Sequence, residues 1–150
     1  VAAGGHLDLW LEPTISVTGS RHRTVSVVRL AGAATCRLVE EVVLGRRGEP
    51  SGRLDLSLRV ERDWRPLVHH DEAFGPDVAG AWSSVSDGAA RHVSSAVVVG
   101  VPAGSSCVRV DADRAAAWLP LADDAAVALA IGHDRPRALC ALRGVGASWA

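Results

Sequence analysis

The side chains in the middle of the sequence that could bind a divalent metal are four consecutive residues: His69, His70, Asp71 and Glu72. Imidazole and carboxylate groups are common ligands of nickel and zinc. In an extended strand, neighbouring side chains point to opposite faces, so His69 would share one face with Asp71. His70 would share the other face with Glu72. Two ligands do not complete a metal site, so a solvated edge strand, a transient metal contact and a catalytic role all stay open for this cluster.

Other arrangements that carry chemistry do not occur in the sequence. It contains no GxSxG nucleophile elbow, and its glycine-rich stretches match neither GxxxxGK[ST] nor GxGxxG. Every basic residue is arginine, so no lysine is present for a Walker-type loop. Cys36, Cys107 and Cys140 stand far apart, and an odd number of cysteines without CxxC spacing favours free thiols in a reducing compartment. The sequence therefore predicts a cytoplasmic protein.

Length and charge narrow the class of protein further. A chain of 150 residues usually forms one domain, so a single domain over residues 1–150 is expected. The formal net charge of −1 argues against nucleic-acid binding, which requires a concentrated basic surface. No apolar run approaches the roughly 20 residues that a membrane helix needs. Neither nucleic acid nor a membrane is therefore an expected partner.

Alternation of apolar and polar residues is the dominant pattern, and it predicts strands with one buried face. The clearest case is Arg53–Arg62, where every second residue is Leu or Val. The stretch Thr35–Leu44 also indicates a strand, and residues 45–52 between the two contain three glycines and a proline. Such a segment is typical of a turn. We therefore expect the two strands to pair as an antiparallel hairpin.

The remaining elements complete a mainly β fold. Val25, Val27 and Leu30 indicate the apolar face of an earlier strand, and Cys140 is expected on the apolar face of a C-terminal helix that starts near the turn residues His133 and Asp134. Residues 115–132 are ambiguous between helix and strand, with strand favoured over 127–131. The other expected segments are strands near 7–11, 67–74, 92–101 and 106–111, a connection with one helical turn over 77–88, and the helix over 135–145. Antiparallel strands in a stacked or helical arrangement fit this pattern, and a sandwich or barrel fits it equally.

One stretch resembles the central signature of a known family. The run from Glu41 to Glu49, followed by Gly52-Arg53-Leu54, is similar to the signature of the UreD (also called UreH) urease accessory proteins, especially their short actinobacterial branch. The residues that take the signature positions are Glu41, Gly45, Arg46, Gly48 and Glu49.

This resemblance implies a function. UreD proteins are non-enzymatic chaperones that join UreF and the GTPase UreG on apo-urease and support nickel insertion, so no tightly bound cofactor is expected and nickel would be transient. Arg46 and Glu49 would either pair across the turn or face a partner. Family members carry an additional N-terminal segment, so this chain is expected to lack the N-terminal part of the family domain and to leave a sheet edge open. The competing hypothesis is a small β-domain that binds a ligand or a divalent metal through residues 69–72.

Overall fold

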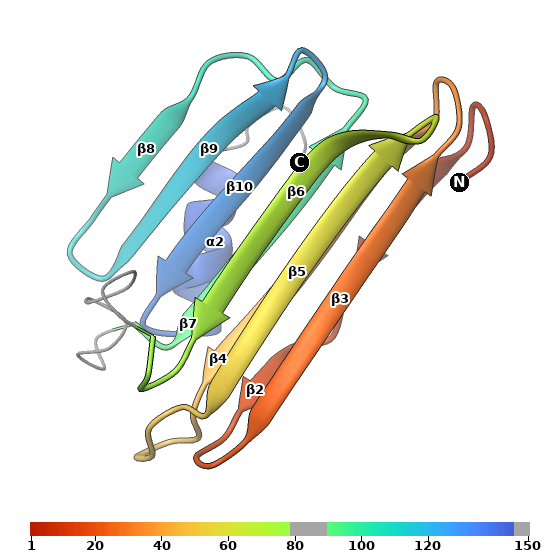
Figure 1. The fold of residues 1–150 in the computed structure, drawn as a ribbon. Coiled ribbons are helices and arrows are strands. Elements are labelled where there is room, and N and C mark those ends of the chain that lie inside the picture. The colour runs from red at the N-terminus through yellow and green to blue at the C-terminus, as the bar shows by residue number, and fades with distance from the viewer. Residues whose placement is uncertain (79–89, 146–150) are drawn as a thin grey trace.

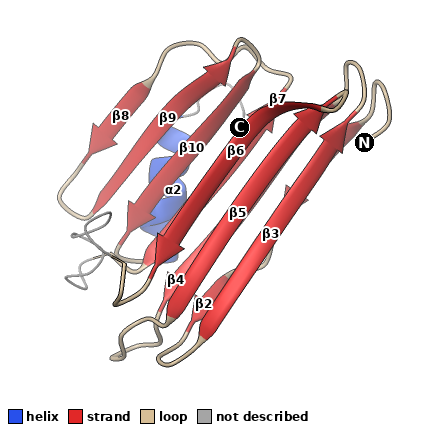
Figure 2. Ribbon diagram, in the orientation of Figure 1, coloured by secondary structure: helices blue, strands red, loops and turns tan. Residues whose placement is uncertain are grey.

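The computed structural model describes residues 1–78 and 90–145. In this part of the chain the fold is mainly β, with one helix at the C-terminal end, as predicted (Figures 1 and 2). The elements are β1 (His6–Trp10), β2 (Thr14–Ser16), β3 (Arg21–Leu30), β4 (Thr35–Leu44), β5 (Arg53–Arg62), β6 (Arg65–Phe74), β7 (His92–Val99), β8 (Cys107–Val110), β9 (Arg114–Ala122), β10 (Ala125–Gly132) and α2 (Arg135–Val145).

The strands form two sheets that pack face to face. The larger sheet has the order β1-β4-β7-β10-β9-β8, with β2 pairing β4 beyond the end of β1. The smaller sheet has the order β3-β5-β6 and lies in front of the larger one in Figure 1. Most neighbours are antiparallel, but β1 and β2 pair β4 in parallel and β3 pairs β5 in parallel.

The alternating residues of the strands fill the space between the sheets. In β5, every second residue from Leu54 to Val60 is buried, while the residues between them turn outward. Because successive side chains point to opposite faces, one apolar stripe per strand suffices to build this layer. Its buried members from both sheets include Val28, Leu30, Cys36, Leu38, Leu58, Val60, Val68, Val97, Val99 and Val127.

The other face of the larger sheet is covered by α2, which lies behind β9 and β10 in Figure 2. The strands β7 and β10 are therefore buried on both faces, which explains their nearly continuous runs of Val and Ala. Asp134 caps the helix, because its Oδ1 accepts the N–H of Arg137 at 3.0 Å. Leu142 of the helix is fully buried in this second layer. No helix in the described ranges is long and apolar enough to cross a bilayer.

The prediction that β4 and β5 pair as a hairpin is wrong. The two strands belong to different sheets, and the connection between them carries the chain from one layer to the other. The strand β4 is buried on both faces and pairs β7 on one side and β1 and β2 on the other, so no edge is left for β5. Alternation predicted both strands correctly but contains no information on which strand pairs with which.

The structure resolves one ambiguity and changes two smaller expectations. The ambiguous residues 115–132 form the two strands β9 and β10, which confirms the strand favoured over 127–131. Val25 and Val27 lie on the outer face of β3, because the buried stripe of that strand consists of Val28 and Leu30. Cys140 is exposed, since α2 turns Ala138 and Leu142 toward the sheet instead. The helical turn expected within residues 77–88 falls almost wholly outside the described residues.

Candidate interaction site

The four candidate metal ligands lie on β6 and divide between its two faces, as predicted. His69 Nε2 lies 3.2 Å from Asp71 Oδ2 on the outer face, where both side chains are more than half exposed. His70 Nε2 lies 3.2 Å from Glu72 Oε1 on the face that points between the sheets. In residues 1–78 and 90–145, no three His, Cys, Asp or Glu side chains gather in a way that could hold a metal ion.

The inward-facing pair belongs to a polar cluster inside the sandwich. Glu40 of β4 is buried and accepts a hydrogen bond from Ser26 Oγ at 2.7 Å. Burial raises the pKa of Glu40, and the negative charge of Glu72 acts in the same direction. The Glu72 carboxylate raises the pKa of His70 against the opposing effect of burial. The pKa values of Glu40 and His70 are therefore both raised, so each group holds its proton more strongly than it would in water.

The loop between β4 and β5 is built around Gly45. Its φ of +73° is in the left-handed region that glycine adopts easily. A Cβ atom at this position would overlap the carbonyl oxygen of Glu49 and lie 2.8 Å from the Arg91 guanidinium. Gly48 also has a positive φ, of +82°, but a Cβ there would meet open space. Glycine is thus required by packing at the first position and only by backbone conformation at the second.

Arg91 holds this loop from outside it. Its Nε donates to the carbonyl oxygen of Leu44 at 3.1 Å, and its Nη2 donates to that of Glu49 at 2.6 Å. The same Nη2 also donates to the carbonyl of Arg46. At the base of the loop, the carbonyl of Ser16 accepts the N–H of Gly45 at 2.8 Å. One side chain therefore fixes three backbone carbonyls, and the loop is anchored to both β2 and the start of β7.

The carboxylate of Glu49 closes the turn from within. Its Oε1 accepts the backbone N–H of Arg46 at 3.0 Å, while the N–H of Glu49 donates to the Arg46 carbonyl at 3.1 Å. Glu49 therefore binds the main chain of Arg46. No ion pair joins it to the Arg46 guanidinium in the described part of the structure.

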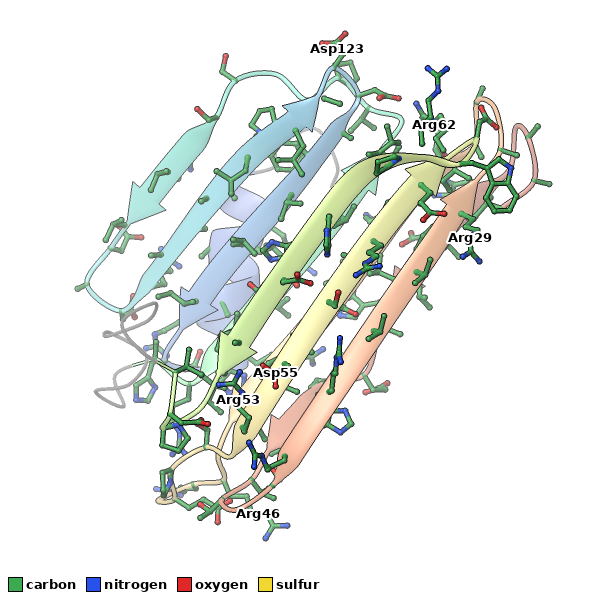
Figure 3. The ribbon with its side chains drawn as sticks, in the orientation of Figure 1. Arg29, Arg46, Arg53, Asp55, Arg62 and Asp123 are labelled. Carbon is green, nitrogen blue, oxygen red and sulfur yellow. The ribbon has the colours of Figure 1, made fainter. Side chains whose placement is uncertain are left out.

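The side chains of Arg46 and Arg47 remain exposed at the tip of the loop. Figure 3 shows Arg46 at the end of the sandwich, pointing away from both sheets. Within the described ranges neither guanidinium has an ion-pair partner. Two unpaired cations therefore project from a loop whose backbone is fixed, which is an arrangement suited to contact with another macromolecule.

Glu41 lies on the opposite face of β4, beneath the start of α2. It is buried, and its two carboxylate oxygens accept hydrogen bonds from Arg135 Nε at 2.7 Å and Nη2 at 2.8 Å. Trp10 Nε1 donates to Oε1 at 2.6 Å. Burial by itself would raise the pKa of Glu41, but the hydrogen bonds from Arg135 and Trp10 outweigh it and the pKa is lowered. Glu41 thus joins β1, β4 and α2 internally.

Sequence reasoning missed the residues that support this site. Arg91 and Arg135 lie far along the chain from the segments that they bind, and nothing in their local sequence distinguishes them from other arginines. The register that places Val43 opposite His92 brings Arg91 beside the loop. Such long-range pairing is not encoded in local spacing.

The fold and this loop define a class of protein: a two-sheet β-sandwich with one covering helix and a rigid, basic, exposed loop. Residues 1–150 match the sequence profile of the family described as UreD urease accessory protein. The chain belongs to this family.

Curated relatives agree with this assignment. A protein of Frankia casuarinae named urease accessory protein UreD is 40% identical over 120 residues, which cover 73% of this chain and 38% of that protein. The UreD protein of Frankia alni is 37% identical over 144 residues, covering 85% of this chain and 43% of its own length. That of a Parafrankia species is 34% identical, with 89% and 52% covered. The chain therefore spans about half, or less, of the length of these relatives.

Proposed function

We propose that this chain acts in urease maturation as a cytoplasmic accessory protein with no catalytic activity of its own. It binds apo-urease together with UreF-like and UreG-like proteins and supports the insertion of nickel into the urease active site. Membership of the UreD family supports the general role. The three cysteines are free thiols, which suits a reducing compartment.

The observation that carries this proposal is the fixed β4–β5 loop with its two outward arginines. Arg91 and Glu49 hold the loop backbone through hydrogen bonds, so little conformational entropy remains to be lost when a partner binds. Arginine is also enriched among the residues that dominate binding energy at protein interfaces. Arg46 and Arg47 are thus the contact residues of the loop, while Gly45 and Glu49 shape it and Glu41 supports the strand that leads into it.

Nickel enters this proposal as cargo of the assembly, not as a resident cofactor of this chain. The pairs on β6 supply two ligands each, which is fewer than a tight nickel site needs. Any contact of nickel with His69, His70, Asp71 or Glu72 is therefore transient, and tight binding by this chain alone is not expected.

The loop is tested by binding. We expect the double variant Arg46→Ala with Arg47→Ala to lose affinity for its partner by about tenfold or more, because two unpaired guanidinium groups are removed from a preorganised surface. The measurement is titration of the purified chain with the UreF-like protein, the UreG-like protein and apo-urease of the same host, each in turn and in combination.

A matched control removes two other exposed arginines. Arg109→Ala with Arg143→Ala takes the same charge from the helix-bearing side of the molecule, where both side chains are exposed. This variant should bind within about twofold of the unmodified chain. Equal affinities for the loop variant, the control and the unmodified chain would contradict the assignment of the loop as the contact surface.

A further inference from the structure

The outer face of the smaller sheet is a second surface with an unusual composition. It is formed by every second residue of β3 and β5 and by the outward residues of β6, and it faces the viewer in Figure 3. No described element packs on this face, because the helix covers the other sheet and the sandwich core lies behind. It is therefore a free surface in the described part of the chain.

Arginines outnumber carboxylates on this face, although the whole chain has a formal net charge of −1. Five arginines stand here against three acidic residues, so the face has a positive excess while the rest of the molecule is negative. The arginines are Arg21, Arg23, Arg29, Arg53 and Arg59, and the acidic residues are Asp55, Glu61 and Asp71.

Two of the carboxylates are used by neighbouring arginines. Arg53 donates to both oxygens of Asp55, and Arg29 Nε lies 3.2 Å from Glu61 Oε2. Arg29 also lies 5.8 Å from the ring centre of Trp64. These contacts occupy Arg29 and Arg53.

The other three arginines have no such direct partner. Arg21, Arg23 and Arg59 make no ion pair within residues 1–78 and 90–145. Their charges act at longer range: Arg23 and Arg21 help to lower the pKa of Asp55, after the larger effect of its hydrogen bond with Arg53. Three cationic groups therefore remain available on this face.

Apolar side chains lie between these cations. Val25 is 53% exposed and Val27 is 46% exposed, and the register places Val25 beside Ser57 and Val27 beside Arg59. Exposed valines surrounded by arginines resemble the centre and rim of a protein interface more than an ordinary solvated face.

A shallow recess of about 370 Å³ lies on the same face. Arg23 and Arg59 line it together with three acidic residues, Asp55, Asp71 and Glu72. The three carboxylates disfavour a further carboxylate inside the recess, so a partner carboxylate would contact these arginines from the open side of the face, where a guanidinium group donates strong and directional hydrogen bonds.

We propose that this face is a docking surface for a protein partner whose contact region is acidic and carries an apolar side chain. The carboxylates of the partner bind Arg23 and Arg59, and its apolar residue covers Val25 and Val27. A further apolar layer of protein is a poorer occupant, because burying unpaired guanidinium groups is costly. Nucleic acid is also poorer, because its regularly spaced phosphates cannot avoid Asp55 and Asp71, whereas a protein can place single carboxylates against Arg23 and Arg59.

The test uses the partners named under the proposed function, so the choice of probes rests on that proposal. The surface itself is separate from the β4–β5 loop. The neutral variant Arg23→Gln with Arg59→Gln and the reversed variant Arg23→Glu with Arg59→Glu are titrated against the UreF-like protein, the UreG-like protein and apo-urease. Binding is measured at about 50 mM and about 300 mM NaCl, since screening weakens exposed charge contacts. Thermal melting and gel filtration establish whether each variant is folded. If the reversed variant does not fold, the neutral variant alone decides the test.

The expected result is that at least one of these proteins binds the unmodified chain about tenfold more weakly at the higher salt concentration. The neutral variant should weaken the same complex by about tenfold at low salt, and reversal should weaken it more. The control Arg109→Glu with Arg143→Glu, on the helix-bearing side, should change it by less than about twofold.

Two results would overturn the inference. If the partners bind but the Arg23 and Arg59 variants retain full affinity, this surface is not the contact, and the proposed function stands without it. If none of the three proteins binds at all, both proposals fail. A 20-nucleotide single-stranded RNA that binds more tightly than every protein tested would also overturn the inference, in favour of nucleic acid.

Discussion

Replacing Gly45 with alanine is expected to lower the free energy of unfolding by about 3 kcal/mol. Two effects add. An alanine in the left-handed region costs about 1 kcal/mol, and the new methyl group overlaps the Glu49 carbonyl oxygen and crowds Arg91. The loop must shift to relieve this contact, and the hydrogen bonds from Arg91 to its carbonyls are then weakened. Urea denaturation of the purified variant measures the loss.

Gly48→Ala is the matched control for this prediction. Its backbone has a similar positive φ, but the added methyl group meets no atom within 4 Å. Only the conformational cost of about 1 kcal/mol is expected there. Equal losses of stability in the two variants would show that the hydrogen bonds from Arg91 and the close contact with the Glu49 carbonyl do not constrain the loop.

Replacing Glu41 with glutamine is the second change with a large expected effect, a loss of about 2 to 3 kcal/mol near pH 7. The variant removes the negative charge that accepts two hydrogen bonds from Arg135 and one from Trp10. The expected loss of stability is smaller than for a fully buried ion pair, because half of the Arg135 side chain is exposed. Chemical denaturation at several pH values measures the difference from the unmodified chain.

The pH dependence of this difference has a defined sign. Since the pKa of Glu41 is lowered in the folded protein, its stabilising contribution is present above the ordinary value of 4.5 and is lost as the pH falls through the folded value. The gap between the two proteins should therefore shrink as the pH falls below 4.5. Glu61→Gln, which disrupts an exposed pair with Arg29, should cost at most about 1 kcal/mol. A gap that stays constant into acid, or a control with the same loss, would contradict the role assigned to Glu41.

Much of the secondary structure could be predicted from local patterns. The strands Thr35–Leu44 and Arg53–Arg62 and the helix Arg135–Val145 occur where alternation and helical spacing place them. These segments are predictable because the environment of each face repeats every second residue in a strand and about every 3.6 residues in a helix. Residues 115–132 were ambiguous because alanine suits both elements, and pairing with β7 and β8 decided the outcome.

The pairing of strands could not be predicted in the same way. A glycine-rich loop after β4 favoured a hairpin, yet β5 pairs β3 in parallel and β6 antiparallel in the other sheet. The energy that decides this comes from burying β4 on both faces, which depends on β7 and α2 far along the chain. The candidate loop could be found from sequence because its signature is local. Arg91, which binds the loop, and Arg135, which binds Glu41 of β4, could not be found, because their contacts depend on the same long-range pairing.

The cluster on β6 shows the opposite case. Period-two geometry correctly predicted that His69 faces the same way as Asp71 and that His70 faces the same way as Glu72. Sequence could not show that the second pair lies between two sheets near Glu40, where burial and charge favour a retained proton. Whether a strand face contacts solvent or lies in the core depends on which layer covers it.

The most direct test of the proposed function is nickel-dependent urease activation in cells. Urease with its UreF-like and UreG-like proteins is expressed with the unmodified chain, with Arg46→Ala and Arg47→Ala together, with the Arg109→Ala and Arg143→Ala control, or without the chain, and urease activity and bound nickel are measured at equal urease levels. The account predicts full activation with the unmodified chain and the control, and strongly reduced activity and nickel content with the loop variant or without the chain. Equal activation in all four cases would contradict a role for this chain in urease maturation.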